Sequence, residues 1–144
     1  MAKRKQPDPG LTHIGQLIPD PQNARKHTPR NIGMIVDALH QVGAARSIVI
    51  DEEGTILAGN ATCEAAAEAG ITKVQVVDAD GETIVAVRRR GLTAEQKAKL
   101  ALYDNRTAEL AEWDAEILKG LDVDLSGMFS ERELEGLLGV APEP

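Results

Sequence analysis

The pattern of apolar and polar positions predicts four helices outside the stretch from Thr55 to Gly70. Residues 31–42 carry apolar side chains at helical spacing, and Gly43 follows as the stop. A second helix is expected over 93–110, opened by Thr93 as N-cap. Short helices are expected over 113–118 and 130–138, the last beginning with a capping box formed by Ser130 and Glu133.

Strand-type residues fill much of the remaining chain. A short strand and turn are expected over 11–18, and a hairpin joins 47–51 to 55–58 through a turn at residues 52–54. Further strands are predicted over 74–78 and 83–87, separated by the turn at 79–82. Together these patterns predict an α/β (α+β) fold with a small mixed sheet and flanking helices.

The stretch from Thr55 to Gly70 is the centre of this arrangement. It predicts a strand, a sharp turn at Gly59 and Asn60, and an alanine-rich helix that Gly70 ends. Asn60 is the expected N-cap, and Gly59 would let backbone approach a ligand without a Cβ. The helix N-terminus is then a candidate anion site, although many such junctions bind nothing.

Composition narrows the classes of function. The chain has 144 residues, 2% aromatic residues and a single cysteine, Cys63. Few aromatics leave little for stacking bases, and one cysteine supports neither an internal disulfide nor a zinc site, so a cytoplasmic chain is the simplest interpretation. No apolar run approaches the roughly 20 residues that span a bilayer, so no membrane association is expected.

The net charge of −7 is unevenly distributed. Residues 1–30 and 88–106 each carry six Lys or Arg against two acids, whereas 107–144 carry two against ten. The basic segments could contact DNA phosphates if the fold brings them together, and the acidic C-terminal region could engage a partner protein. Ordinary solvated charge is the alternative interpretation.

Several motifs occur in an order that is typical of one superfamily. They are the loop Asn23-Ala24-Arg25, the junction at 56–60, the Leu-Ala-x-x-Asp-Asn-Arg helix at 100–106, Glu-Leu-x-x-Trp-Asp at 109–114, and Glu-Leu-x-x-Leu-Leu at 133–138. With them, residues 11–140 resemble the ParB/sulfiredoxin superfamily. The chain is most similar to the short ParB-like nuclease domain proteins of phages and other mobile elements.

This resemblance implies a pocket for a nucleoside triphosphate (CTP or ATP) and Mg²⁺. It makes Asp104 and Asn105 the catalytic and metal-binding residues, because a hard cation prefers carboxylate and amide oxygens. The implied nucleotide or phosphate contacts are Arg25, Arg46, Gly59, Asn60, Thr62 and Arg106. Thr62 stands where the family has an arginine, so it can hydrogen-bond a phosphate oxygen but adds no charge.

The predicted organisation is a disordered leader (1–10), a ParB/sulfiredoxin-like core (11–90), a helical extension with the Asp-Asn-Arg motif (91–140) and a tail (141–144). On the predicted helix, residues 104–106 fan across about 200°, so one of them should be structural. We expect Asn105 at the pocket, Leu102 against the sheet, and Arg106 either on phosphate or paired with Glu109 or Glu112.

Two functions follow from these observations. The first is a DNA-processing enzyme that nicks DNA or hydrolyses a nucleotide. The second is a non-catalytic accessory or regulatory module with a vestigial pocket, favoured by Thr62. In either case Gly59→Val is expected to damage ligand binding more than folding. The sequence leaves the base of the nucleotide and the oligomeric state open.

Overall fold

The computed structural model describes residues 10–139, which contain five α-helices, one short 3₁₀ helix and two pairs of short strands. The predicted tail and all of the predicted leader except Gly10 lie outside these residues. The helices are η1 (Ile14–Gln16), α1 (Pro29–Val42), α2 (Asn60–Ala69), α3 (Ala94–Leu110), α4 (Ala115–Gly120) and α5 (Glu131–Leu138). The strands are β1 (Arg25–Lys26), β2 (Val49–Ile50), β3 (Ile56–Ala58) and β4 (Glu112–Trp113).

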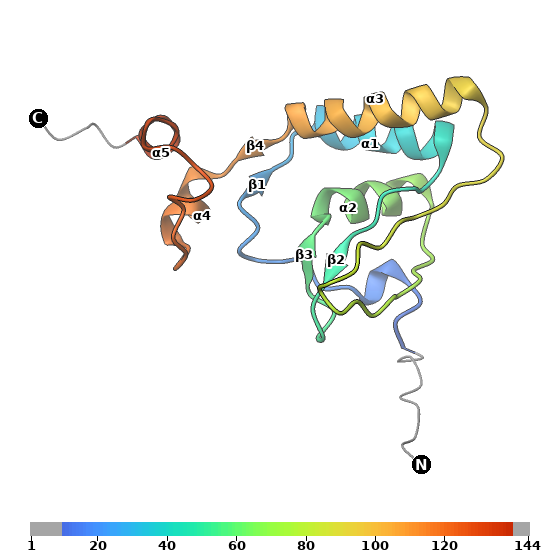
Figure 1. The fold of residues 1–144 in the computed structure, drawn as a ribbon, viewed down its shortest axis with the longest axis horizontal. Helices are drawn as coiled ribbons and strands as arrows, with labels where there is room; N and C mark the ends of the chain where they lie inside the picture. Colours follow the sequence, from blue (N-terminus) through green and yellow to red (C-terminus); the bar gives the residue numbers. More distant parts are fainter. Residues whose placement is uncertain (1–9, 140–144) are drawn as a thin grey trace, which may run out of the picture.

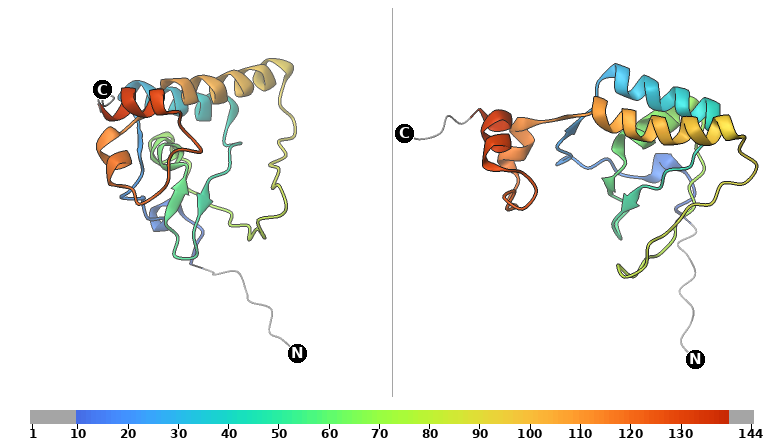
Figure 2. Two further views of the ribbon diagram at one scale, coloured as in Figure 1. Left: turned by 60° about the vertical axis from the view of Figure 1, so that its left-hand side comes forward. Right: turned by 45° about the horizontal axis from the view of Figure 1, so that its top comes forward.

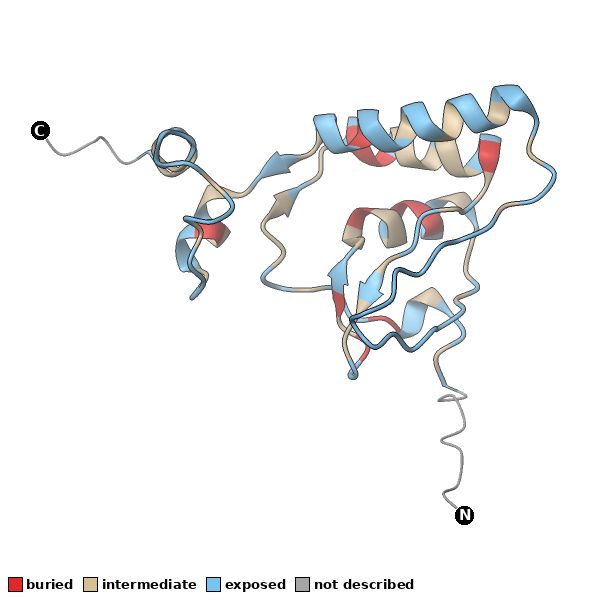
Figure 3. Ribbon diagram, in the orientation of Figure 1, coloured by how far each residue is buried: buried red, intermediate tan, exposed pale blue. Residues whose placement is uncertain are grey.

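Helix α1 packs against both α2 and α3 (Figure 1; Figure 2). Towards α2 the contact is apolar, because Ile32 of α1 meets Ala61 and Ala65 of α2. Ala65 is fully buried, and small side chains on α2 let the two helix backbones approach closely. These buried residues lie where the two helices meet (Figure 3).

Towards α3 the contact is polar. Asn31 is only 1% exposed, and its Nδ2 donates to the carbonyl oxygen of Thr107 at 2.8 Å. At the other end of α1, the carbonyl of Gln41 accepts from Gln96 Nε2 at 3.2 Å, and its side-chain Oε1 accepts from Lys99 Nζ at 3.0 Å. Hydrogen bonds at both ends therefore fix α3 along α1.

The helix ends agree closely with the sequence. Thr93 and Gln96 form a capping box at the start of α3, and Ser130 and Glu133 form another at the start of α5. The box places hydrogen-bond donors on the carboxylate of Glu133 and thereby lowers its pKa. Gly70 ends α2 in the left-handed conformation, as predicted.

The predicted mixed sheet is wrong. The two strand pairs, β1 with β4 and β2 with β3, are both antiparallel. Residues 74–78 and 83–87 form no strand, and residues 11–18 form η1 with single bridges to Lys73 and Thr55. Strand propensity reflects how well a side chain fits a pleated, half-buried surface, and the valines at 76, 77, 85 and 87 remain exposed instead. The α+β class is retained.

The C-terminal helices form a separate small cluster that extends from the three-helix layer (Figure 1). The rings of Trp113 and Phe129 meet edge to face with centroids 5.3 Å apart, and Leu118 of α4 is buried. The helix predicted over 113–118 begins only at Ala115, because Asp114 is its N-cap and Trp113 pairs with Arg25 in the β1–β4 ladder. Across residues 10–139, none of the helices is both long and apolar enough to cross a membrane.

Candidate nucleic-acid interface

The conformation and packing of the turn before α2 require a glycine at position 59. Gly59 has φ +106°, and a Cβ added to it would lie 2.3 Å from Cγ2 of Ile48. The space beside Gly59 is thus filled by a side chain of this protein and forms no open cradle for a phosphate. A side chain at this position would disturb folding directly, so the structure favours a folding defect over the binding defect expected for Gly59→Val.

Asn60 does not cap α2, contrary to the sequence prediction. Gly59 occupies the N-cap position, and no side chain caps the helix. The Asn60 amide instead accepts from the backbone N–H of Asp20 at 3.2 Å and donates to the carbonyl of Ile56 at 3.3 Å. Asn60 therefore links the loop after η1 to the start of the helix. The sequence could not indicate this role, because Asp20 lies 40 residues away.

Two neighbours complete the first turn of α2. Thr62 is half-buried there. Cys63 is also half-buried, and burial raises the pKa of its thiol, so the thiol stays protonated at neutral pH. This agrees with Cys63 as a small packed residue rather than a reactive one.

On α3 the Asp-Asn-Arg residues point in three directions, as their spacing requires. Asp104 pairs with Arg46, with NH1 and Oδ1 3.4 Å apart. Arg106 pairs with Glu109 at 2.7 Å, which is one of the two roles expected for it. Asn105 is exposed between them. Asp104 and Arg106 thus occupy opposite flanks of the helix.

The expectation for Leu102 is wrong. Its side chain is 69% exposed, because α3 lies against α1 and not against a sheet. Thr107 is buried on the face towards α1, and Tyr103 is half-buried one turn before it. The apolar spacing of α3 alone could not identify this face, since the interface is polar.

Arg25 contacts the C-terminal end of α3. Its NH2 donates to the carbonyl of Ala108 at 2.6 Å, and its guanidinium lies 4.7 Å from the ring centroid of Trp113. The same arginine belongs to the β1–β4 ladder. These contacts give Arg25 a structural role in joining the C-terminal helices to the core.

The structure pairs Arg46 with Asp104, but the other predicted pocket residues lie on β1, at the start of α2 and on α3. Gly59, Asn60 and Thr62 start α2, whereas Asp104 and Asn105 lie on α3, and the two helices contact different sides of α1. Within residues 10–139, no three His, Cys, Asp or Glu side chains gather in a way that could hold a metal ion. The predicted site uses one carboxylate, one amide and the phosphate oxygens, so this absence does not test it, and binding of Mg²⁺ or a triphosphate stays a prediction.

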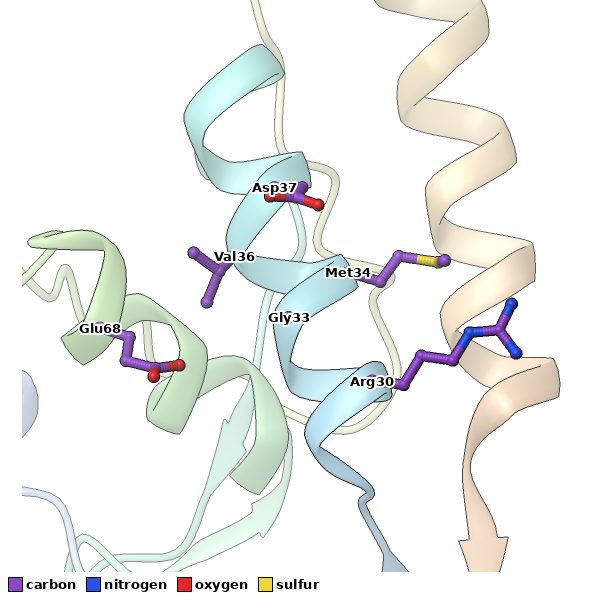
Figure 4. A pocket seen from close by; sticks show the side chains of 6 residues that line it. All are labelled: Arg30, Gly33, Met34, Val36, Asp37 and Glu68. Carbon is purple, nitrogen blue, oxygen red and sulfur yellow. The ribbon is translucent and has the colours of Figure 1, made fainter.

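Two hollows open on the surface of α1. One, of about 220 Å³, lies towards α3 and is lined by Met34, Lys99, Leu102, Tyr103 and Arg106. Another, of about 490 Å³, is lined by Arg30, Gly33, Met34, Val36, Asp37 and Glu68 (Figure 4). The acids Asp37 and Glu68 make the larger hollow unsuited to an anion, whereas the smaller one has two cationic side chains and no acid in its lining.

A third cation, Arg30, lines the larger hollow, which shares Met34 with the smaller one. Arg30 and Met34 both extend from α1 towards α3 (Figure 4). Arg30 is exposed and forms no ion pair with any residue that the structure describes. We call the surface formed by Arg30, Met34, Lys99, Leu102, Tyr103 and Arg106 the α1–α3 groove. The sequence pointed to Arg106 and to the two basic segments that contain Arg30 and Lys99, but not to Met34. The i, i+4 spacing of Arg30 and Met34 on α1 is the signal for their shared face.

The three arginines at positions 88–90 differ in their surroundings. Arg89 NH1 donates to the carbonyl oxygens of Val42 at 2.7 Å and Ala44 at 3.0 Å, at the C-terminal end of α1. It therefore caps that helix, where a cation is favoured. Arg88 and Arg90 remain exposed.

Comparison with known proteins finds a relative of this chain. The chain is 32% identical over 86 residues to the ParB-like nuclease domain-containing protein YnaK of Escherichia coli (strain K12), an alignment that covers 60% of this chain and 87% of YnaK. The chain therefore belongs to the ParB-like nuclease domain-containing proteins. No family model matches the chain, and no solved structure matches it.

Proposed function

We propose that this protein has a DNA-related role and binds the phosphate backbone of DNA along the α1–α3 groove. The observation that carries the proposal is that Lys99 and Arg106 line an apolar hollow with Leu102. Arg30 of α1 extends towards the same helix α3 (Figure 4). Cationic side chains supply most of the affinity of a sequence-independent DNA contact. Family membership supports DNA as the polyanion, because YnaK is named for a nuclease domain.

The ion pairs already present along the groove do not prevent this contact. Lys99 lies 3.4 Å from Glu95, and Arg106 lies 2.7 Å from Glu109, with all four side chains more than 40% exposed. Exposed pairs of this kind contribute about 0–1 kcal/mol, so a phosphate can replace the glutamate as partner. The net charge of −7 opposes the approach of DNA, so binding should be weak and strongly salt-dependent.

Fluorescence anisotropy with a labelled duplex at several salt concentrations tests the proposal. Contacts to three phosphates predict a log–log slope of about −2.7. Lys99→Ala and Arg106→Ala should each reduce the magnitude of the slope by about one. Lys119→Ala is the matched control, because Lys119 is paired with Glu116 on α4, outside the groove. Unchanged slopes in both groove variants would contradict the proposal.

DNA nicking or nucleotide hydrolysis by Asp104 and Asn105 is a second candidate, favoured by the name of the relative. Asp104 is exposed, and its carboxylate contacts Arg46 at 3.4 Å. A plasmid-nicking assay with and without Mg²⁺ tests the candidate. Wild-type activity that Asp104→Ala abolishes would support it, while equal activity in both proteins would point to a contaminant.

Thr62, which stands where the family has an arginine, favours an accessory module without catalysis over this second candidate. In that case the acidic C-terminal region, which includes α4 and α5, would be the surface for a protein partner. Calorimetric titration with CTP and ATP in the presence of Mg²⁺ separates the two. Tight binding of either nucleotide would contradict a vestigial pocket.

A further inference from the structure

The segment 82–90 is an exposed, unpaired stretch of strand-type sequence. It lies between Gly81, with φ +83°, and Gly91, with φ +82°, and it contains neither helix nor strand. Among residues 10–139, no backbone–backbone hydrogen bond involves Ile84 to Arg90. The backbone N–H and C=O groups of residues 84–90 are therefore available to another strand, whereas the N–H of Glu82 donates to Asp80 Oδ1 at 2.8 Å.

Side chains of the segment alternate between two faces. Arg89 reaches inward to the carbonyls at the end of α1, which places the odd-numbered positions towards the body of the protein. Ile84 is 93% exposed, whereas the odd-numbered Val85 and Val87 are 46% and 53% exposed. The outer face consequently presents Glu82, Ile84, Ala86 and Arg88.

The outer faces of two copies of this segment are complementary to each other when the copies pair antiparallel. Glu82 and Arg88 lie three residues before and three residues after Val85. When two copies of the segment pair antiparallel with Val85 opposite Val85, each Glu82 lies opposite an Arg88, and each Ile84 lies opposite an Ala86. Opposite charges directly across an antiparallel pair stabilise it, and the same register satisfies the exposed backbone groups.

We propose that a second copy of this chain pairs with residues 82–88 in this register and forms a two-fold symmetric dimer. The pairing is isologous, because each segment offers the same residues to the other. One pair of short strands buries far less than the roughly 800 Å² per partner of a stable interface, so the dimer is weak and depends on concentration. This inference is independent of the proposed DNA contact.

Sedimentation velocity over a range of protein concentrations, without DNA, tests the proposal. The wild-type protein should shift reversibly from monomer to dimer as concentration rises. Glu82→Arg and Arg88→Glu each place like charges opposite each other twice, and each should weaken association about tenfold. Mixing the two variants restores opposite charges at both pairs, so the mixture should recover dimers that neither variant forms alone.

Ile84→Lys supplies an independent variant that should fold normally, since Ile84 is 93% exposed. It should weaken association while its circular dichroism matches that of the wild type. A wild-type protein that remains monomeric up to millimolar concentration would overturn the proposal. So would a dimer that Ile84→Lys and both charge reversals leave unchanged, because its interface would then lie elsewhere.

Discussion

The two sides of α1 are packed by different means. Towards α2, Ile32 meets the small residues Ala61 and Ala65 in an apolar interface. Towards α3, the contacts run through hydrogen bonds of Asn31 and Gln41. Burial of apolar surface is favourable in any orientation, whereas hydrogen bonds require particular geometry. The first interface thus supplies stability, and the second sets where α3 and its cationic side chains lie.

Gly59→Val should have the largest effect, because it disturbs the start of α2 and with it the apolar side of α1. Strain at φ +106° and collision with Ile48 predict a loss of about 2–5 kcal/mol in the free energy of unfolding. Urea denaturation measures this loss. Ile48→Ala removes the colliding methyl group, so the double variant should be less destabilised than the sum of the single variants. Additive losses would show that Ile48 is not the obstacle.

Asn31→Ala probes the polar side of α1. It removes the hydrogen bond to the Thr107 carbonyl at 2.8 Å and leaves that buried group without its partner, at a cost of about 1–3 kcal/mol. Asn105→Ala, at an exposed position of α3, is the control and should change stability by less than about 0.5 kcal/mol. Equal effects in the two variants would mean that Asn31 does not hold α3.

Arg89→Ala should cost less, about 0.5–2 kcal/mol, because it removes a cation from the carbonyls at the end of α1. Its exposed neighbour provides the comparison, and Arg90→Ala should be close to neutral. Thermal unfolding of both variants gives the result. If the two losses were the same, the capping role of Arg89 would be refuted.

The smallest effect is expected for Leu102→Ala, because Leu102 is 69% exposed on the groove. Its unfolding free energy should stay within about 0.5 kcal/mol of the wild type. Ile32→Ala, on the apolar side of α1, should lose about 2–5 kcal/mol. A large loss for Leu102→Ala would place this side chain in the core, as the sequence first indicated.

Local sequence signals predicted the helices well. The apolar spacing around Ile32, the N-cap at Thr93 and the capping box at Ser130 depend on residues close in sequence, and the structure confirms all three. The strands at 74–78 and 83–87 were wrong, because a strand also requires a partner that propensity cannot supply.

Long-range polar contacts could not be predicted either, because their partners lie far away in the sequence. Asn60, Arg25 and Arg89 each looked suited to a ligand, yet each bonds to backbone far away in sequence. Nothing in the sequence indicated that Asn31 is buried, since a polar residue in the first turn of a helix is normally exposed. Of the predicted site, Arg106 and the segment containing Lys99 lie on the α1–α3 groove.

The location of the DNA contact is the central claim, and chemical-shift mapping by NMR tests it most directly. Titration of the ¹⁵N-labelled protein with a short duplex should shift the amide signals around Arg30, Lys99 and Arg106, and leave those of Gly59 to Thr62 in place. Shifts centred on the start of α2, with the groove unchanged, would contradict the account.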